Sequence, residues 1–303
     1  MALGKALLFG AIEAGGTKFI CAVGTEPSNL KITRLPTESA KTTTAKAVDF
    51  LREASGGDLQ AVGIGSFGPV DLCPSSSTYG HITSTPKLNW QNFDFVGTVH
   101  SALGVPIGFD TDVDAAALGE ARWGAAQSVS DFIYLTVGTG IGGGALVNGQ
   151  ILHGLLHPEM GHIRVPHDRE RDPYPGACPF HGDCLEGLAS GPAMQQRWRV
   201  PATELPPDHP AWELEAHYLA LGLANLVCTL SPKRIVLGGG VMQQDCLFPL
   251  IRKELARLLN GYIQVREVTT HGDEYIVPAK LGGRAGIAGA LVLAEKAFHD
   301  QPR

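Results

Sequence analysis

Two glycine-rich turns, one in each half of the 303-residue chain, constrain its fold more than any other feature. In the first, residues 15–18 place a double glycine, a threonine and a lysine between strand-like segments 7–12 and 19–23. The second, residues 138–144, is followed by a strand-like segment that ends in an Asn148-Gly149 hairpin turn. Glycine lets a phosphate approach the main chain, and successive N–H groups form an anion-binding concavity. The duplicated design therefore predicts two turns that clamp a polyphosphate.

Neither turn fits the two common nucleotide-binding loops. The second turn has the glycine spacing of the dinucleotide fingerprint, but that motif needs a helix directly afterwards, whereas a strand is expected here. In the first turn, Gly10 and Gly15 have P-loop spacing, yet Gly16 stands where that motif carries lysine. Each turn alone could be an ordinary hairpin, and their duplication weakens this alternative.

The remaining chain alternates strand-like and helix-like segments, which predicts an α/β protein. Further strands are predicted at 61–67, 107–109, 132–137 and 234–237, and helices at 43–54, 112–123, 188–198, 212–230, 248–259 and 286–298. A chain of this length exceeds the usual single core, so two lobes with a cleft between them are expected. We place the N-terminal lobe at 1–115, joined by a C-terminal helix at 286–303, and the C-terminal lobe at 116–285.

Charge and composition argue against several classes of function. The net charge of -6 offers no basic face for nucleic acid, and no segment approaches the roughly 20 apolar residues of a membrane-spanning helix. The apolar start runs directly into the first turn without a small-residue cleavage site, so we expect a cytoplasmic protein without nucleic-acid or membrane partners. Of six cysteines, two are clustered and four scattered, which is not a secreted disulfide framework.

Three acids, Asp110, Asp112 and Asp114, stand where a predicted strand ends and a predicted helix begins. Helix capping accounts for about two of them, because an N-cap carboxylate accepts hydrogen bonds from first-turn N–H groups. A phosphoryl-transfer enzyme also requires a carboxylate that accepts the proton of the attacking hydroxyl. Asp112 is our candidate for that base.

A compact group of thiols and imidazoles predicts a structural zinc site. Three ligand-type side chains lie within seven residues: Cys178, His181 and Cys184. One upstream histidine would complete a closed tetrahedral set, and a cytosolic setting favours metal over disulfide. His162 is the preferred fourth ligand, with His157 and His153 as competitors. The alternative is a pair of free thiols beside surface histidines.

Two carboxylates flank the predicted zinc loop. Glu159 precedes His162 by three residues, and Glu186 follows Cys184 by two, so a stapled loop would hold both carboxylates rigidly for a polyhydroxyl sugar. The run 238–240 ends a buried strand and could seat an adenosine. The residues expected to hold the nucleotide are Gly15, Gly16, Thr17, Lys18, Gly138, Thr139, Gly140, Gly239 and Gly240.

These motifs, taken in order, resemble those of the bacterial ROK sugar kinases, and within them the fructokinase branch. The matching segments are 13–18, 65–71, 111–112, 138–142, 158–162, the Cys/His group and 238–241. The resemblance implies an actin/hexokinase-like fold of two ribonuclease-H-like lobes, with the active site in the cleft between them. It also implies ATP with Mg²⁺ as donor, Asp112 as base, sugar contacts from Glu159, His162 and Glu186, and a homodimer.

Three departures from the family pattern qualify the resemblance. Glu13 replaces the usual aspartate before the first turn, Thr111 stands where many members carry asparagine, and His181 takes the place of a cysteine. The first two favour fructose over glucose. The fructokinase branch shares the Thr85-Pro86-Lys87 stretch, so we expect Pro86, like Thr111, to lie at the wall of the sugar site.

The resulting expectation is ATP-dependent phosphorylation of D-fructose at O6, which gives fructose 6-phosphate and ADP. A broad-specificity kinase for mannose and glucose is the alternative of the same class. A non-catalytic sugar sensor and a sugar-responsive repressor are alternatives of another class. We expect no repressor, because only about a dozen residues precede the first turn and leave little room for a DNA-binding segment.

Overall fold

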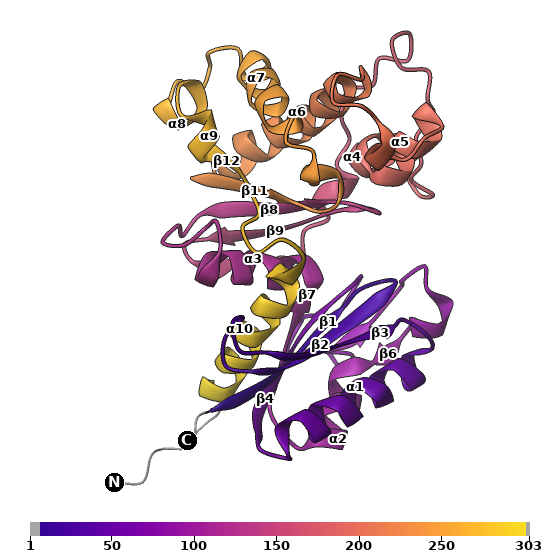
Figure 1. The fold of residues 1–303 in the computed structure, drawn as a ribbon, viewed down its shortest axis with the longest axis vertical. Coiled ribbons are helices and arrows are strands. Elements are labelled where there is room, and N and C mark those ends of the chain that lie inside the picture. The colour runs from indigo at the N-terminus through magenta and orange to yellow at the C-terminus, as the bar shows by residue number, and fades with distance from the viewer. Residues whose placement is uncertain (1–6, 301–303) are drawn as a thin grey trace. The chain divides into compact units, whose positions relative to one another are not determined.

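The computed structural model describes residues 7–300, which divide into two compact units (Figure 1). Unit 1 takes in the chain up to Gly124, the short segment His153–His157 and the chain from Gly283 onward. Unit 2 takes in Ala125–Leu152 and Pro158–Gly282. The boundary predicted at residue 115 falls inside helix α3 (Asp112–Trp123), which belongs wholly to unit 1.

Unit 1 is built on a five-stranded sheet of order β3-β2-β1-β4-β7. Its strands are β1 (Leu8–Ala14), β2 (Lys18–Gly24), β3 (Lys31–Pro36), β4 (Leu59–Ser66) and β7 (Ile107–Thr111). The hairpin β1–β2–β3 is antiparallel, whereas β4 and β7 run parallel to β1. The carboxyl ends of β1, β4 and β7 therefore meet at one edge, which is where ligands bind in such sheets.

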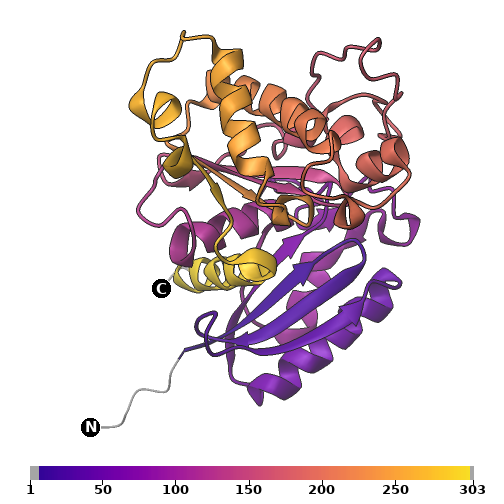
Figure 2. The ribbon, with the colours of Figure 1, turned by 45° about the horizontal axis from the view of Figure 1, so that its top comes forward.

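Both faces of this sheet are covered at its central strands, which explains why β1, β2 and β4 are almost wholly buried. Helix α1 (Ala40–Ser55), capped by Ser39, packs on one face with Ile12 and Ile64 in its core. Helix α10 (Ala285–His299) lies on the other face with Phe9 and Ala11 (Figure 2). Gly63 permits the close approach of α10, because a Cβ there would stand 1.7 Å from the Ala290 carbonyl oxygen. Helix α2 (Phe95–Leu103) completes unit 1.

The connection between β4 and α2, residues 67–94, forms a long loop in unit 1. It contains the short strands β5 (His81–Ile82) and β6 (Phe93–Asp94), which pair antiparallel, and the 3₁₀ turn η1 (Leu88–Trp90). Trp90 is buried against Phe19 of β2, with ring centroids 5.2 Å apart. This aromatic contact ties the loop to the strand that follows the first glycine turn.

Unit 2 carries a second five-stranded sheet of order β10-β9-β8-β11-β12. Its strands are β8 (Phe132–Val137), β9 (Ile141–Val147), β10 (Gln150–Ile151), β11 (Arg234–Gly238) and β12 (Ile276–Pro278). The apolar side chains of β8 and β11 share one core with α6 (Ala211–Leu230) and α7 (Leu247–Leu259). Asn148 and Gly149 both have positive φ between β9 and β10, so the predicted hairpin turn is confirmed.

The helix predicted at 188–198 is wrong as a single element. The structure has two helices, α4 (Leu185–Ala189) and α5 (Gly191–Trp198), separated by Ser190. The Ser190 side chain caps α5, and the first turn of α5 contains a proline. The remaining short elements of unit 2 are η2 (Met160–His162), η3 (Ala202–Glu204), η4 (Val241–Gln243), α8 (Arg266–Thr269) and α9 (Gly272–Tyr275), and η5 (Gly282–Arg284) precedes α10. Within residues 7–300, no helix combines the length and apolarity needed to span a bilayer.

Candidate functional site

The first glycine turn links β1 to β2 in unit 1 and is braced by Thr37, the residue after β3. The Gly15 N–H donates to the Lys18 carbonyl at 3.0 Å, and the Thr37 hydroxyl donates to the Gly15 carbonyl at 2.8 Å. A Cβ on Gly15 would stand 2.8 Å from the Lys18 carbonyl oxygen, so this position requires glycine. Of the four residues predicted to bind the nucleotide here, Thr17 and Lys18 are exposed and the two glycines are partly exposed.

The second glycine turn, residues 138–140, links β8 to β9 in unit 2. The Gly138 N–H donates to the Gly140 carbonyl at 2.9 Å, and the Gly191 N–H at the start of α5 donates to the Gly138 carbonyl at 2.8 Å. Glu186 fills the space beside the turn, because a Cβ on Gly140 would stand 2.5 Å from its carboxylate. The turn is thus held on both sides.

The third glycine run lies directly beside the second turn. Gly239 has a φ of 93°, and a Cβ there would stand 2.2 Å from the Val137 carbonyl oxygen at the end of β8. The Gly240 nitrogen is 3.8 Å from a Cβ built on Gly138. The structure therefore gathers the predicted residues Gly138, Thr139, Gly140, Gly239 and Gly240 at the carboxyl ends of β8 and β11.

Asp112 is the first residue of α3, immediately after β7. The cap of this helix is Thr111, whose hydroxyl accepts from the Asp114 N–H at 3.0 Å and donates to the Asp114 carboxylate at 2.7 Å. The N-cap is therefore a threonine and none of the three acids, although Asp112 and Asp114 both lie in the first turn of the helix. Asp112 remains partly exposed at a helix N-terminus, where the helix dipole favours a negative charge.

Glu13, at the end of β1, is a buried carboxyl next to this position. Burial first, and then the negative charge of Asp112, raise the pKa of Glu13 to about 7. Its Oε2 has no hydrogen-bond partner among the described residues, and a Cβ on Gly286 at the start of α10 would stand 2.7 Å from its carboxyl carbon. Sequence reasoning noted Glu13 only as a departure from a motif, although an acid within an apolar strand is itself a signal.

Asp110, Asp114 and His153, all in unit 1, form what we call the carboxylate–histidine cluster. The His153 Nε2 lies 3.1 Å from Asp110 and 3.8 Å from Asp114. The hydrogen bond to Asp110 and the ion pair with Asp114 raise the pKa of His153 to about 10, so the ring is an imidazolium at neutral pH. Burial raises the pKa of Asp114 to about 6.

His162, Cys178, His181 and Cys184, all in unit 2, form the thiol–imidazole cluster, whose ligand atoms lie within 4.8 Å of one another. The His162 Nδ1 is 3.8 Å from the Cys178 sulfur and 3.6 Å from the Cys184 sulfur, and the His181 Nδ1 is 3.6 Å from Cys178. Zinc bond lengths of about 2.3 Å to sulfur and 2.0–2.1 Å to nitrogen imply N–S separations of about 3.6 Å in a tetrahedron. The spacing of these atoms thus fits a zinc ion.

The two other histidines considered as fourth ligand are engaged elsewhere. His153 belongs to the carboxylate–histidine cluster, and the His157 Nε2 accepts a hydrogen bond from the Val70 N–H at 3.3 Å. Both competitors to His162 are therefore wrong. No signal in the local sequence separates the three histidines, because the difference lies in which distant segments each one meets.

The predicted sugar residues differ in how firmly they are held. Glu186 accepts from the Ile141 N–H at 2.9 Å, a contact across 45 residues of chain. Glu159 is exposed directly before η2, and His162 directs Nδ1 toward the thiols, which leaves Nε2 for another partner. Pro86 is exposed on the loop of unit 1. Glu186 is thus held at the second turn by this hydrogen bond.

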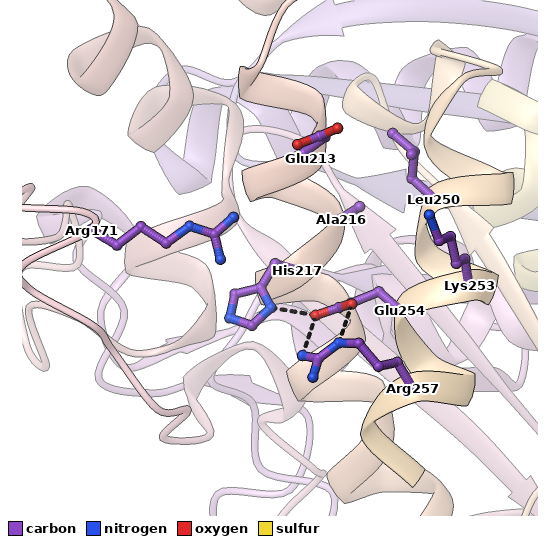
Figure 3. Close-up of a pocket in the computed structure, with 8 residues that line it drawn as sticks. All are labelled: Arg171, Glu213, Ala216, His217, Leu250, Lys253, Glu254 and Arg257. Carbon is purple, nitrogen blue, oxygen red and sulfur yellow. Dashed lines mark hydrogen bonds and ion pairs between the residues drawn. The ribbon is translucent and has the colours of Figure 1, made fainter. Parts of the chain in front are cut away.

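A separate pocket of about 460 Å³ in unit 2 contains none of the predicted site residues (Figure 3). Its lining is largely charged, and the lining residue Glu254 accepts from His217 at 2.6 Å and from Arg257 at 2.7 Å. These contacts, with Arg257 contributing most, lower the pKa of Glu254 to about 2. These contacts partly neutralise the charges that line the pocket. None of its lining residues belongs to a glycine turn or is a candidate for the catalytic base.

Comparison with known proteins places the chain in a family. The model of the ROK family matches residues 9–297. A fructokinase of Pediococcus pentosaceus is 42% identical over 293 residues, which cover 96% of this chain and 99% of the relative. A fructokinase of Zymomonas mobilis is 42% identical over 294 residues, covering 95% and 96% respectively.

A solved structure of similar fold supports the same placement. The ROK hexokinase from Thermus thermophilus superposes with a TM-score of 0.77 at 28% identity, covering 97% of this chain and all of that one. The α/β class and the actin-like, two-lobed kinase fold predicted from the sequence are thereby confirmed. With the family model and the relatives spanning nearly its whole length, this chain belongs to the ROK family of sugar kinases.

Proposed function

We propose that this protein is an ATP-dependent fructokinase that transfers the γ-phosphoryl group of ATP to O6 of D-fructose. The observation that carries the proposal is the position of Asp112, a partly exposed carboxylate at the start of α3, in a chain whose relatives are fructokinases over nearly their full length. The products are fructose 6-phosphate and ADP, and Mg²⁺ enters with ATP.

Asp112 acts as the general base. It accepts the proton of the attacking 6-hydroxyl while the bond between the γ-phosphorus and the bridging oxygen of ADP breaks. Its buried neighbour Glu13 has a pKa of about 7, so Glu13 holds a proton for much of the time at neutral pH. That proton reduces the negative charge beside Asp112, a division of roles common to paired carboxyls in unlike environments.

The two glycine turns and the third glycine run bind the nucleotide. Main-chain N–H groups of the turns hold phosphates, and the run after β11 borders the adenosine, as the open end of an α/β sheet usually does. Glu159, His162 and Glu186 bind sugar hydroxyls, and Thr111 and Pro86 border the sugar. The nucleotide residues are Gly15, Gly16, Thr17, Lys18, Gly138, Thr139, Gly140, Gly239 and Gly240.

A zinc ion bound by the thiol–imidazole cluster is part of the proposal. The cluster joins η2 to the loop before α4, so the metal would fix the segment between Glu159 and Glu186. Two thiols and two imidazoles form a closed set without a place for a reacting water, which suits a structural role. We also propose a homodimer, which sedimentation of the purified protein would test.

The decisive experiment measures ADP release with MgATP across fructose, mannose, glucose and N-acetyl sugars. We expect the highest kcat/KM with fructose, and a fall in kcat of roughly 10²–10⁴-fold in Asp112→Asn, because an amide cannot accept the proton. Asp49→Asn, a change at an exposed acid on α1, is the matched control and should keep wild-type kcat.

Different results would lead to different conclusions. A higher kcat/KM with mannose or glucose would replace fructose by a broader kinase specificity. If no sugar stimulates ADP release, the kinase proposal fails and a sugar sensor takes its place.

A further inference from the structure

Lys87 lies directly against the first glycine turn, although 71 residues separate it from Gly16 in the sequence. A Cβ built on Gly16 would stand 3.1 Å from the Lys87 Cε and 3.9 Å from its Nζ. Its side chain is only partly exposed, and its ammonium has no hydrogen bond or ion pair with any residue in the range 7–300. A cation held against a glycine turn without a counter-ion offers its charge to a ligand.

The loop around Lys87 holds this position firmly. Lys87 is the residue before η1, and Trp90 at the end of η1 is buried, with its indole N–H donating to the Glu38 carbonyl at 2.9 Å. Trp90 also stacks on Phe19, the second residue of β2. On the other side, Thr85 is buried and its carbonyl accepts from the Gln91 amide at 2.9 Å. The lysine is thus anchored to the strand that leaves the turn.

Gly16 itself is matched to this lysine. Any side chain there would press on the Lys87 stem, so glycine lets the aliphatic part of the lysine lie across the turn. Lys18 belongs to the same turn but is exposed at the start of β2. Lys87 is therefore the more preorganised cation, and less side-chain freedom is lost when it meets a ligand.

We infer that Lys87 contacts the phosphoryl group during transfer and stabilises the negative charge on its oxygens. This inference rests on the proposed kinase function and on the phosphate-binding role of the first glycine turn. Lys87 neither gains nor loses a proton: the bond from phosphorus to the ADP oxygen breaks, the bond to the sugar O6 forms, and Asp112 takes the hydroxyl proton. Fixed charge aimed at the transferring group contributes more to the transition state than to the bound substrates.

The test replaces Lys87 by methionine, which keeps the length of the stem and removes the charge. We expect Lys87→Met to lower kcat with fructose about 100-fold, as the loss of one preorganised donor does elsewhere, and to change the KM for fructose less than about threefold. Lys87→Arg restores a positive charge and should recover most of the kcat. Lys41→Met, at an exposed lysine on α1, is the matched control for loss of a lysine charge.

A binding measurement separates this inference from the choice of substrate. ADP with fluoroaluminate mimics a transferring phosphoryl group, and calorimetry of its binding requires no turnover. Lys87→Met should weaken this binding by about the same factor as kcat, while binding of ADP alone changes little. Equal affinity of wild type and Lys87→Met for the mimic overturns the inference, whichever sugar is the acceptor. Absence of sugar-stimulated ADP release in the wild type overturns the proposed function instead.

Discussion

The thiol–imidazole cluster of unit 2 and the carboxylate–histidine cluster of unit 1 both bring metal-ligand atoms within 4.8 Å of one another. They differ in how their charges are balanced. In the first, two buried thiols face two imidazoles, and the thiols become ligands only as thiolates, whose charge a metal ion would balance. In the second, the imidazolium of His153 already lies between Asp110 and Asp114.

This difference separates a metal site from an ion pair where distance alone does not. A divalent ion in the carboxylate–histidine cluster would have to displace the proton of His153, whose pKa the two carboxylates hold near 10. Zinc in the thiol–imidazole cluster displaces thiol protons and gains soft sulfur ligands that suit it. We therefore expect metal in one cluster and only a proton in the other.

The largest expected effect comes from removing the thiols. The double variant Cys178→Ser, Cys184→Ser should lose about one zinc per chain and have a Tm lower by roughly 10 °C. It should also bind fructose more weakly, because the metal no longer fixes the segment between Glu159 and Glu186. Metal analysis of the purified chain and calorimetric unfolding measure the first two effects. Zinc retained in this double variant would contradict the assignment, and His153→Gln, the control from the other cluster, should keep its zinc.

Sequence reasoning found the thiol–imidazole cluster because three of its ligands are close neighbours in the chain. It also placed α3 and β8 at their observed residues, since both begin where a strong pattern begins. The helix predicted at 188–198 merged the end of α4 with α5, because apolar periodicity continues through Ser190 while this serine ends one helix and caps the next. Sequence patterns thus located α3 and β8, whose boundaries depend on residues close by in the chain.

The carboxylate–histidine cluster and the place of Lys87 could not be found in this way. His153 meets Asp110 across 43 residues, and Lys87 meets Gly16 through the packing of Trp90 on Phe19. The one available signal was the presence of three acids at the junction of β7 and α3, more than capping requires. This signal pointed to function at Asp112. It could not identify His153 as the histidine that pairs with Asp110 and Asp114.

A smaller effect is expected from breaking the ion pair of unit 1. His153→Gln leaves two buried carboxylates without their cation, and we expect a loss of about 1–2 kcal/mol in the free energy of unfolding, since solvent screens a side chain that is about a third exposed. Urea unfolding at pH 7 measures it. His217→Gln is the matched control, because Arg257 still pairs with Glu254 and the loss should be about 0.5 kcal/mol. Equal losses in both variants would show that His153 does not hold its carboxylates together.

The smallest effect is the pH dependence of that loss, and it has a definite sign. The pKa of His153 rises from its ordinary value of 6.5 to about 10 on folding, so the folded protein holds this proton more tightly than the unfolded chain. The stabilisation is fully present below pH 6.5 and is lost as the pH rises toward 10. The pKa of Asp114 rises from 3.8 to about 6, so its own contribution in the wild type is lost as the pH rises through 6, below the range in which His153 is expected to lose its proton.

The difference in unfolding free energy between wild type and His153→Gln should therefore shrink steadily from pH 7 to pH 10. Taking the difference removes the contributions of groups that His153 does not contact, such as Glu13, whose pKa is about 7. Urea unfolding at four pH values across this range is sufficient. A difference that stays constant would mean that His153 is neutral in the folded protein. The carboxylate–histidine cluster would then lack its internal cation and would become, like the thiol–imidazole cluster, a candidate for metal.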